Sequence, residues 1–138
     1  YPFSQKFGWL GDRYGVTWQL SLSGQKQQIS PYLLFTQAVY GKAEAAMRYW
    51  CGIFEDAGIT GLNLYDKTSA EAAGERAGTV MFAGFKLEGQ PFMAADSGYD
   101  HQFTFTEGIS LMVNCAGQAE IDNLWQALAE GGQEQPCG

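Results

Sequence analysis

The fold class is decided by residues 32–54, which read YLLFTQAVYGKAEAAMRYWCGIF. The apolar and aromatic run Ile29–Gln37, which includes the start of this stretch, predicts a strand. Between Gly41 and Phe54 the apolar residues recur at positions 43, 46, 47, 50, 53 and 54. This is the spacing of one face of an α-helix. The stretch therefore predicts a strand that leads into an amphipathic helix.

Further strands are predicted after this unit. Ile59–Tyr65 predicts a weaker strand, and the two segments Thr79–Leu87 and Pro91–Ala95 predict a hairpin that turns at Glu88-Gly89-Gln90. Residues 67–78 are small and polar, and they predict a long loop that could include one helical turn.

The beginning of the chain predicts a strand and a linker. Val16–Leu22 alternate between apolar and polar side chains, which predicts a half-buried strand. The preceding Asp12–Gly15 predicts a turn. Residues 23–28 contain no apolar side chain and form the best linker candidate in the chain.

A second unit of strand and helix follows residue 98. Residues 101–106 alternate in polarity, Ile109–Cys115 predicts a strand, and Gln118–Glu130 predicts a second amphipathic helix that ends at Gly131-Gly132. The chain is therefore predicted to be α+β with an internal repeat of strand, helix and strands. The second repeat lacks its closing strands, which the otherwise unattached strands of residues 8–22 could supply.

Composition excludes several classes of protein. The 138 residues suffice for one ordinary domain, and 46% hydrophobic with 17% charged residues predicts a folded chain. The net charge of −7 argues against nucleic acid or an anionic membrane as a partner. No apolar run approaches the roughly 20 residues that span a bilayer, and no secretory signal opens the chain.

The cysteines favour a cytoplasmic protein. Cys51, Cys115 and Cys137 are odd in number and have no close pair, so we interpret them as reduced thiols, two of them in the core. Their spacing does not fit a zinc site.

Four segments in this order resemble the vicinal-oxygen-chelate superfamily of glyoxalase I and the bleomycin-resistance proteins. They are residues 32–50, the Gly-Gln hairpin within residues 85–94, residues 101–111 and residues 121–125. Within the superfamily, the chain is most similar to PhnB-like domains, which are often labelled 3-demethylubiquinone 3-methyltransferase-like. The resemblance implies two βαβββ modules whose curved mixed sheets surround a small-molecule pocket, and a homodimer.

The order of the segments departs from that family. Such domains usually run from a Cys-Gly pair, like Cys137-Gly138, into a segment like Gly8–Gln19, which here lies at the other end of the chain. We therefore expect a permuted module or a piece of a tandem protein. Its parts would be a closing hairpin of a second module (1–24), a linker (25–28), a first module (29–98) and the start of the second module (99–138), all within one domain. The hairpin could complete the fold in its own chain or by exchange with a partner chain.

The resemblance also implies where a ligand would lie. Metal-dependent members place His, Glu or Gln on four facing strands, and the matching positions here are Ser30, Met93 or Ala94, Ile109 and Gln19. Only Gln19 is a ligand type of that family, so we expect no catalytic metal and no other cofactor. The pocket is expected to be lined by Gln19, Ser30, Tyr32, Met93, Phe103 and Ile109.

His101 is the only histidine and the one weak catalytic candidate. It is either a loop residue that forms local hydrogen bonds, or a general base oriented by Asp96 or Asp100.

Three functions compete. The first is a small-molecule enzyme or binding domain with a mostly apolar pocket. The second is a non-catalytic module that sequesters a cationic ligand, as bleomycin-resistance proteins do. The third is a methyltransferase, which would need a Gly-rich turn between a parallel strand and a helix. The stretch Gly84–Gly89 lies in a predicted hairpin instead, so we do not expect methyl transfer.

Overall fold

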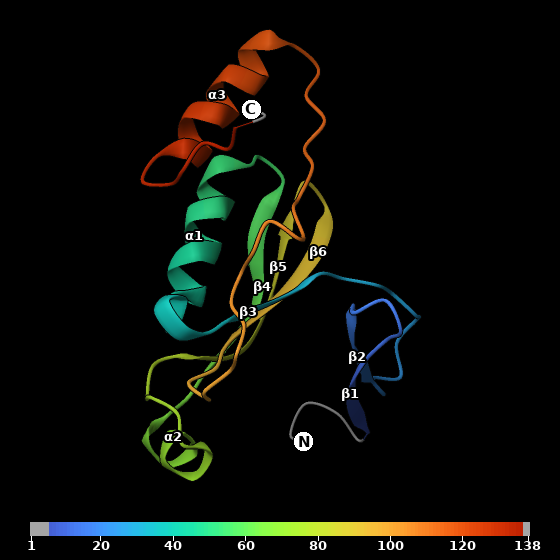
Figure 1. The fold of residues 1–138 in the computed structure, drawn as a ribbon, viewed down its shortest axis with the longest axis vertical. Helices are drawn as coiled ribbons and strands as arrows, with labels where there is room; N and C mark the ends of the chain where they lie inside the picture. The colour runs from blue at the N-terminus through green and yellow to red at the C-terminus, as the bar shows by residue number, and fades with distance from the viewer. Residues whose placement is uncertain (1–5, 137–138) are drawn as a thin grey trace.

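The computed structural model describes residues 6–136 and shows an α+β fold built on a four-stranded sheet (Figure 1). Its elements are β1 (Phe7–Gly11), β2 (Thr17–Ser21), β3 (Tyr32–Phe35), a 3₁₀ helix (Gln37–Val39), α1 (Ala43–Ile53), β4 (Ala57–Leu64), α2 (Lys67–Ala73), β5 (Val80–Leu87), β6 (Gln90–Asp96) and α3 (Gln118–Ala129). No helix of the described part is long and apolar enough to cross a membrane.

The sheet has the strand order β3-β6-β5-β4. Strand β3 runs parallel to β6, and the other two pairs are antiparallel. Helix α1 covers one face of the sheet (Figure 1). The predicted strand and helix of residues 29–54 are therefore confirmed, with tighter bounds than the sequence gives.

The core lies between α1 and that face. Met47 on α1 is fully buried, and Phe85 on β5 is 1% exposed. The ring of Trp50 stacks on Phe85 with centroids 5.9 Å apart, and Phe92 stacks on the same ring at 5.1 Å. Because side chains alternate between the faces of a strand, the sequence neighbours of Phe85 and Phe92 point to the face away from α1.

The carboxylate of Asp96 joins three elements at the end of β6. The side chain is 4% exposed and accepts hydrogen bonds from the backbone N–H groups of Gly41, Ala43 and Val80. It therefore ties β6 to the beginning of α1 and to the beginning of β5.

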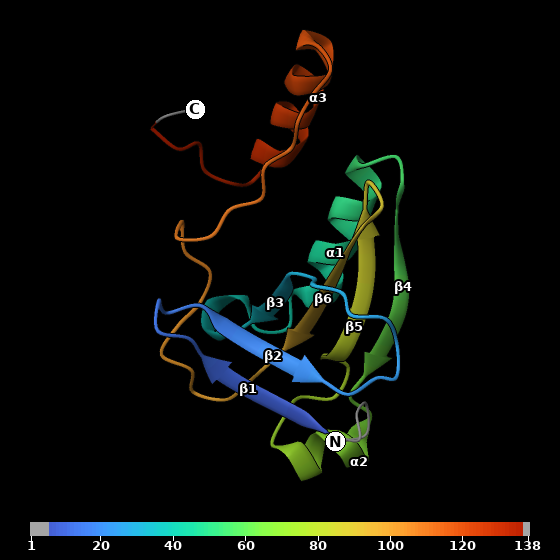
Figure 2. The same cartoon turned by 90° about the vertical axis from the view of Figure 1, so that its right-hand side faces the viewer.

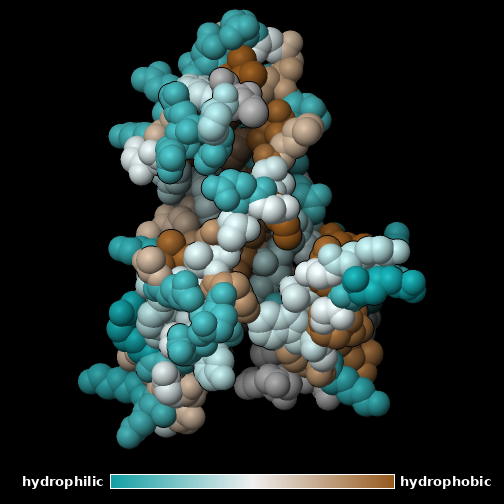
Figure 3. All heavy atoms as spheres, in the orientation of Figure 1, coloured by the Kyte–Doolittle hydropathy of each residue, from teal (hydrophilic) through white to brown (hydrophobic). Residues whose placement is uncertain are grey.

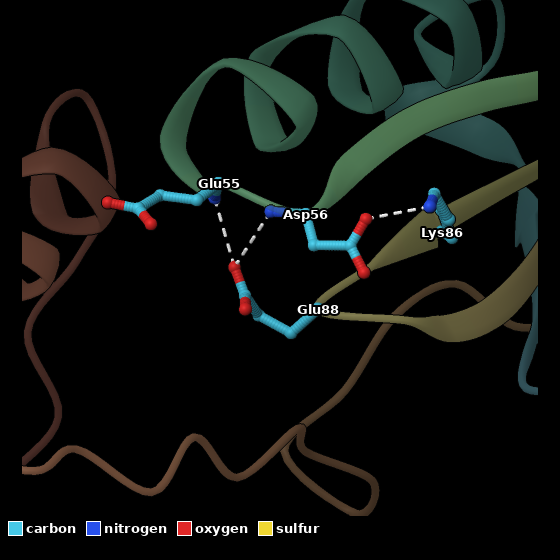
Figure 4. A network of polar contacts seen from close by, with 4 residues as sticks. All are labelled: Glu55, Asp56, Lys86 and Glu88. Atoms are coloured by element: carbon cyan, nitrogen blue, oxygen red, sulfur yellow. Dashed lines mark hydrogen bonds and ion pairs between the residues drawn. The ribbon is translucent and has the colours of Figure 1, made fainter.

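A second polar cluster fixes the opposite end of the sheet (Figure 4). Glu88 accepts hydrogen bonds from the backbone N–H groups of Glu55 and Asp56, and Asp56 forms an ion pair of 2.7 Å with Lys86. The predicted turn at Glu88-Gly89-Gln90 is thus confirmed and is tied to the connection between α1 and β4.

The segment predicted as a loop at residues 67–78 contains a helix. Asp66 caps α2, because its side chain accepts a hydrogen bond from the backbone N–H of Ser69 at 2.7 Å. This bond lowers the pKa of the Asp66 carboxyl. Gly74, with φ of +69°, ends the helix. The prediction of a loop was wrong because it weighed the small polar residues and missed the cap.

The strands predicted at residues 101–106 and Ile109–Cys115 are also wrong. Neither segment has regular structure, and nearly all of their side chains are exposed. A strand needs a neighbouring strand for its backbone hydrogen bonds, and none lies beside these residues in the described part. The second amphipathic helix is confirmed as α3, although none of its residues is buried.

Strands β1 and β2 form a separate two-stranded hairpin. The predicted turn is held by Asp12, which accepts hydrogen bonds from the backbone N–H groups of Tyr14 and Val16 and from the indole of Trp18. The indole contributes most to lowering the pKa of Asp12. The hairpin lies on the side of the sheet away from α1, and α3 lies at the other end of the molecule (Figures 1 and 2). Residues 23–28 form no helix or strand.

Candidate functional site

The face of the sheet opposite α1, called here the open face, carries a row of residues from all four strands. Tyr32 on β3 lies beside Met93 on β6, which lies beside Gly84 on β5, and Gly84 is the partner of Gly61 on β4. The row alternates with the core residues on each strand, so these positions point away from α1. Two of the predicted pocket residues are therefore neighbours here.

The two glycines of this row differ: the backbone of Gly61 at the edge is open, and that of Gly84 is covered by a side chain. A Cβ atom at Gly61 would meet nothing within 4 Å. A Cβ atom at Gly84 would lie 2.9 Å from the hydroxyl of Thr60, the extra residue at an irregularity in β4. Glycines inside strands often mark places where another group approaches the sheet closely.

Tyr32 presents a phenol that stays protonated over the whole physiological range. Burial raises its pKa to about 12, and the neighbouring Tyr65 phenol adds to the shift. Burial also raises the pKa of Tyr65, which directly follows β4. Both groups can donate a hydrogen bond to a ligand on this side of the sheet.

His101 lies at the end of β6, among three aromatic rings. Its Nε2 atom is 2.9 Å from the hydroxyl oxygen of Ser97. Its ring centroid is 4.9 Å from that of Phe103, 5.1 Å from that of Tyr99 and 6.5 Å from that of Trp9. Ser97 follows Met93 and Ala95 at alternate positions, so the histidine is bonded to a residue that continues the open face.

The local interpretation of His101 is the one supported by its hydrogen bonds. The carboxylate of Asp96 is engaged by three backbone N–H groups. It therefore does not orient the imidazole, which bonds Ser97 instead. A general base oriented by Asp96 finds no support in these hydrogen bonds, and orientation by Asp100 stays a prediction.

The segment that carries His101 is anchored to the end of β3. The hydroxyl of Thr36, which is fully buried, donates a hydrogen bond of 2.6 Å to the carbonyl of Phe103. The side-chain amide of Gln37 donates to the carbonyl of His101. Phe105 packs its ring edge against Phe35 at a centroid distance of 5.0 Å. These contacts hold residues 101–105 beside the sheet without any strand pairing.

The remaining predicted pocket residues are distributed around this region. Gln19 is half-buried and is the cross-strand partner of Trp9, so it lies on the hairpin face that meets His101. Ser30 is half-buried and precedes β3 by two residues. Phe103 contacts the His101 ring, whereas Ile109 is 78% exposed and lies in the irregular segment.

Sequence reasoning missed four residues of this region. They are Trp9, Tyr65, Ser97 and the irregularity at Thr60. Ser97 could have been found by extending the alternation of Met93 and Ala95 by one step. Trp9 and Tyr65 depend on contacts between distant segments. The irregularity at Thr60 leaves no clear sequence signal.

Two surface hollows of the described part are lined by residues outside the row of Tyr32, Met93, Gly84 and Gly61. One follows Gln25–Gln28, and another lies at Arg48, Cys51, Gly52 and Ile59, on the side of α1. Burial raises the pKa of the Cys51 thiol, and its side chain packs against the core as predicted. Cys137 lies outside the described residues.

The residues present do not fit a metal or a nucleotide cofactor of the common methyltransferase type. Within residues 6–136, no three His, Cys, Asp or Glu side chains come together as a possible metal site. The four positions matched to metal ligands hold Gln19, Ser30, Met93 and Ile109, which supply a single ligand of the usual type. Gly84–Gly89 lies in the β5–β6 hairpin, as predicted, and not between a strand and a helix.

Comparison with known proteins gives a consistent assignment. The family model named 3-demethylubiquinone-9 3-methyltransferase matches residues 27–138. No curated protein matches the chain. A solved PhnB protein from Bacillus cereus, which carries the same methyltransferase name, is 39% identical with a TM-score of 0.66 and covers 75% of this chain and 74% of its own. A protein from Staphylococcus aureus is 28% identical with a TM-score of 0.38, and the match covers 75% of this chain and 68% of that protein.

The match of the family model covers most of the chain and includes β3 to α3. The resemblance to PhnB-like domains, predicted from residues 32–50, 85–94, 101–111 and 121–125, is confirmed. The chain belongs to the PhnB-like, 3-demethylubiquinone-9 3-methyltransferase family.

Proposed function

We propose that the chain is a small-molecule-binding domain of the vicinal-oxygen-chelate type, with its ligand on the open face. The row of Tyr32, Met93, Gly84 and Gly61 carries this proposal, because it places a protonated phenol beside a flexible thioether and ends at the uncovered backbone of Gly61. No metal takes part in this proposal, since the matched positions lack the side chains that would hold one.

The face suits a ligand with an apolar ring system and an oxygen acceptor. Met93 offers apolar contact, while Tyr32 and Tyr65 are donors. Ser97, which bonds His101, lies four positions after Met93, so the two residues are about 13 Å apart at the usual rise of a strand. A ligand of two or three fused rings fits that length. A quinone is the chemical class that these groups would bind best.

The methyltransferase name of the relatives raises the question of a site for S-adenosylmethionine. Methyl transfer from S-adenosylmethionine would require a site for that cofactor. The common site has a Gly-rich turn between a parallel strand and a helix. Residues 37–42, between β3 and α1, contain a single glycine, Gly41, and do not form such a turn. We therefore propose binding without methyl transfer. We also place the protein in the cytoplasm, where the unpaired thiols of Cys51 and Cys115 would stay reduced.

A thermal-shift experiment tests this proposal with four probes. They are menadione as the quinone, berberine as a cationic aromatic molecule, S-adenosylmethionine, and Mn²⁺, Ni²⁺ or Zn²⁺. A ligand that binds only the folded state stabilises it by about 2.7 kcal/mol at 100 times its dissociation constant. We expect menadione to raise the melting temperature. We expect neither S-adenosylmethionine nor the metals to do so.

Variants locate the binding. Tyr32→Phe and Gly61→Val alter the open face, and Arg48→Ala alters the exposed side of α1 on the other side of the sheet. We expect the first two to reduce the shift caused by menadione and the third to leave it unchanged. A shift with berberine alone would favour the sequestering module, to which the net charge of −7 is suited. A shift with S-adenosylmethionine or a metal would refute the proposal.

A further inference from the structure

Strand β4 contains a β-bulge at Thr60, next to the centre of the open face. Ile59 pairs with Phe85 and Gly61 pairs with Gly84, so Thr60 is an extra residue between two regular pairs. A bulge of this kind redirects a side chain, and bulges are over-represented next to functional sites. The direction that the Thr60 side chain takes is therefore informative.

Gly84 provides the space that the Thr60 hydroxyl occupies. A Cβ atom at Gly84 would lie 2.9 Å from the hydroxyl oxygen. Apart from the chain neighbours of Gly84, this oxygen is the only atom of the described residues within 4 Å of that position. Gly84 is also the cross-strand partner of Met93. The hydroxyl of Thr60 thus lies on the open face, beside the residue that offers apolar contact to a ligand.

The hydroxyl of Thr60 is available to a ligand. The residue is exposed, and its side chain forms no hydrogen bond with another residue of the part that the structure describes. Two other hydroxyls near the sheet are already engaged, since that of Ser97 bonds His101 and that of Thr36 bonds the carbonyl of Phe103. A hydroxyl can donate one hydrogen bond and accept others. Thr60 therefore adds a polar group to an otherwise apolar stretch of the row.

Tyr32 and the hydroxyl of Thr60 flank Met93 from opposite sides. Tyr32 pairs with Met93 across β3 and β6, and Gly84, next to the hydroxyl, pairs with Met93 across β6 and β5. Two strand spacings, or about 10 Å, separate the backbone of Tyr32 from that of Gly84. A ring that lies on Met93 would have one hydroxyl donor on each side.

The β1–β2 hairpin gives this region an apolar neighbour. It lies on the side of the sheet away from α1 (Figures 1 and 2), and the space-filling view shows hydrophobic side chains on it (Figure 3). An aromatic ring system on the open face would therefore lie towards an apolar surface, with its polar groups directed to the few hydroxyls of the row.

We propose that Thr60 is a specificity-determining residue of the open face, and that the ligand is a 1,4-quinone whose ring lies on Met93. One carbonyl oxygen accepts a hydrogen bond from Tyr32, and the opposite oxygen accepts one from Thr60. This inference rests on the proposed binding function. It adds the class of quinone and the residue that recognises the second oxygen.

Calorimetric titration with menadione, a 1,4-quinone, tests the role of Thr60. Thr60→Val keeps the shape of the side chain without the hydroxyl, Thr60→Ser keeps the hydroxyl, and Thr68→Val removes an exposed hydroxyl from α2 as a control. We expect Thr60→Val to raise the dissociation constant about 3- to 10-fold, because one neutral hydrogen bond is lost. Thr60→Ser and Thr68→Val should bind as the wild-type chain does.

A second probe separates recognition of the oxygen from a change of shape. 2-Methylnaphthalene has the rings and the methyl group of menadione but no carbonyl oxygen. We expect Thr60→Val to bind it no more weakly than the wild-type chain does. A loss of the same size for both probes would show that Thr60 only shapes the sheet, and would overturn the assignment.

The failure of this inference differs from the failure of the binding proposal. If menadione does not bind the wild-type chain, both fall. If menadione binds the wild-type chain and Thr60→Val equally well, or if Thr60→Ser binds as weakly as Thr60→Val, only the role of Thr60 is overturned.

A measurement on the wild-type chain does not depend on the folding of variants. The methyl resonances of isotopically labelled threonines are followed by NMR as menadione is added. We expect the resonance of Thr60 to shift and that of Thr68 to stay in place. An unchanged Thr60 resonance in the presence of bound menadione would overturn the inference.

Discussion

The carboxylate of Asp96 lies 2.7 Å from the backbone nitrogen of Gly41, although 55 residues separate them. The same side chain accepts hydrogen bonds from Ala43 at 3.3 Å and from Val80 at 2.8 Å. One buried carboxylate thus fixes where α1 begins relative to β5 and β6. A substitution that removes its charge or its shape should lower the free energy of unfolding of the domain.

Replacement of Asp96 by Asn tests this role. An amide has one acceptor oxygen, so its NH₂ group would face a backbone donor on one side. Hydrogen bonds to a charged group contribute about 1.5–3 kcal/mol, and an unsatisfied buried group costs about 1–3 kcal/mol. We expect the free energy of unfolding to fall by ~2–4 kcal/mol in urea. The exposed control Asp100→Asn should change it by less than ~0.5 kcal/mol, and equal losses in both variants would contradict this account.

Replacement of Gly41 by Ala should destabilise the same corner for a steric reason. Gly41 has φ of +83°, and a Cβ atom there would lie 2.0 Å from an Nη atom of Arg76. The guanidinium of Arg76 lies over the Tyr40 ring at 4.7 Å, so it would have to leave this position. Strain in this backbone region costs about 1–3 kcal/mol.

We expect a loss of that size by thermal unfolding of Gly41→Ala. Gly8→Ala serves as the matched control, because a Cβ atom at Gly8 meets nothing within 4 Å. An unchanged melting temperature for Gly41→Ala would show that the loop before α1 can rearrange freely.

The buried phenol of Tyr32 predicts a loss of stability at high pH. Its pKa is about 12 in the folded chain, against 10.0 for an unperturbed tyrosine. The contribution is complete below pH 10 and is lost as the pH rises towards 12, because the unfolded chain releases its proton first. The loss amounts to about 3 kcal/mol.

Tyr32→Phe isolates this contribution from the other groups that titrate at high pH. Urea unfolding of both proteins between pH 9 and pH 12 should show a steeper fall for the wild-type chain. Parallel curves for the two proteins would mean that Tyr32 is exposed to solvent in the folded state.

The hydroxyl of Thr36 should govern the mobility of the segment that carries His101. Thr36→Val keeps the shape but removes the donor to the Phe103 carbonyl. The net loss is about 1 kcal/mol. We expect faster hydrogen exchange at residues 101–105, with exchange in α1 and β5 unchanged. Uniformly faster exchange would indicate global destabilisation instead of a local anchor.

The sequence predicts the first half of the fold well because local patterns and packing agree there. The helical spacing between Ala43 and Phe54 and the Gly-Gln turn after Leu87 both give elements whose apolar faces meet in one core. The second half fails for the opposite reason. Ile109–Cys115 has the composition of a strand, but composition does not provide the neighbouring strand that its backbone needs.

The candidate site is predicted only in part. Tyr32 and Met93 point to the same face of the sheet. The alternation along each strand sets this direction, and it can be read from local sequence. The pairing of His101 with Ser97 and the approach of Trp9 depend on where residues 99–105 and the hairpin lie in space. Asp96 or Asp100 was expected to orient the histidine. Asp96 instead accepts hydrogen bonds from backbone donors at the beginnings of α1 and β5, and no local sequence pattern predicts these bonds.

The Asp12 turn has a consequence for the order of synthesis. All of its partners lie within six residues, so the hairpin can close as soon as it leaves the ribosome. The central sheet is complete only when β6 ends at Asp96, about 75 residues after the end of β2 at Ser21. At about 5–20 residues per second, those residues take ~4–15 s. During that interval the nascent hairpin would be closed on its own, with Trp18 and Leu20 exposed to solvent.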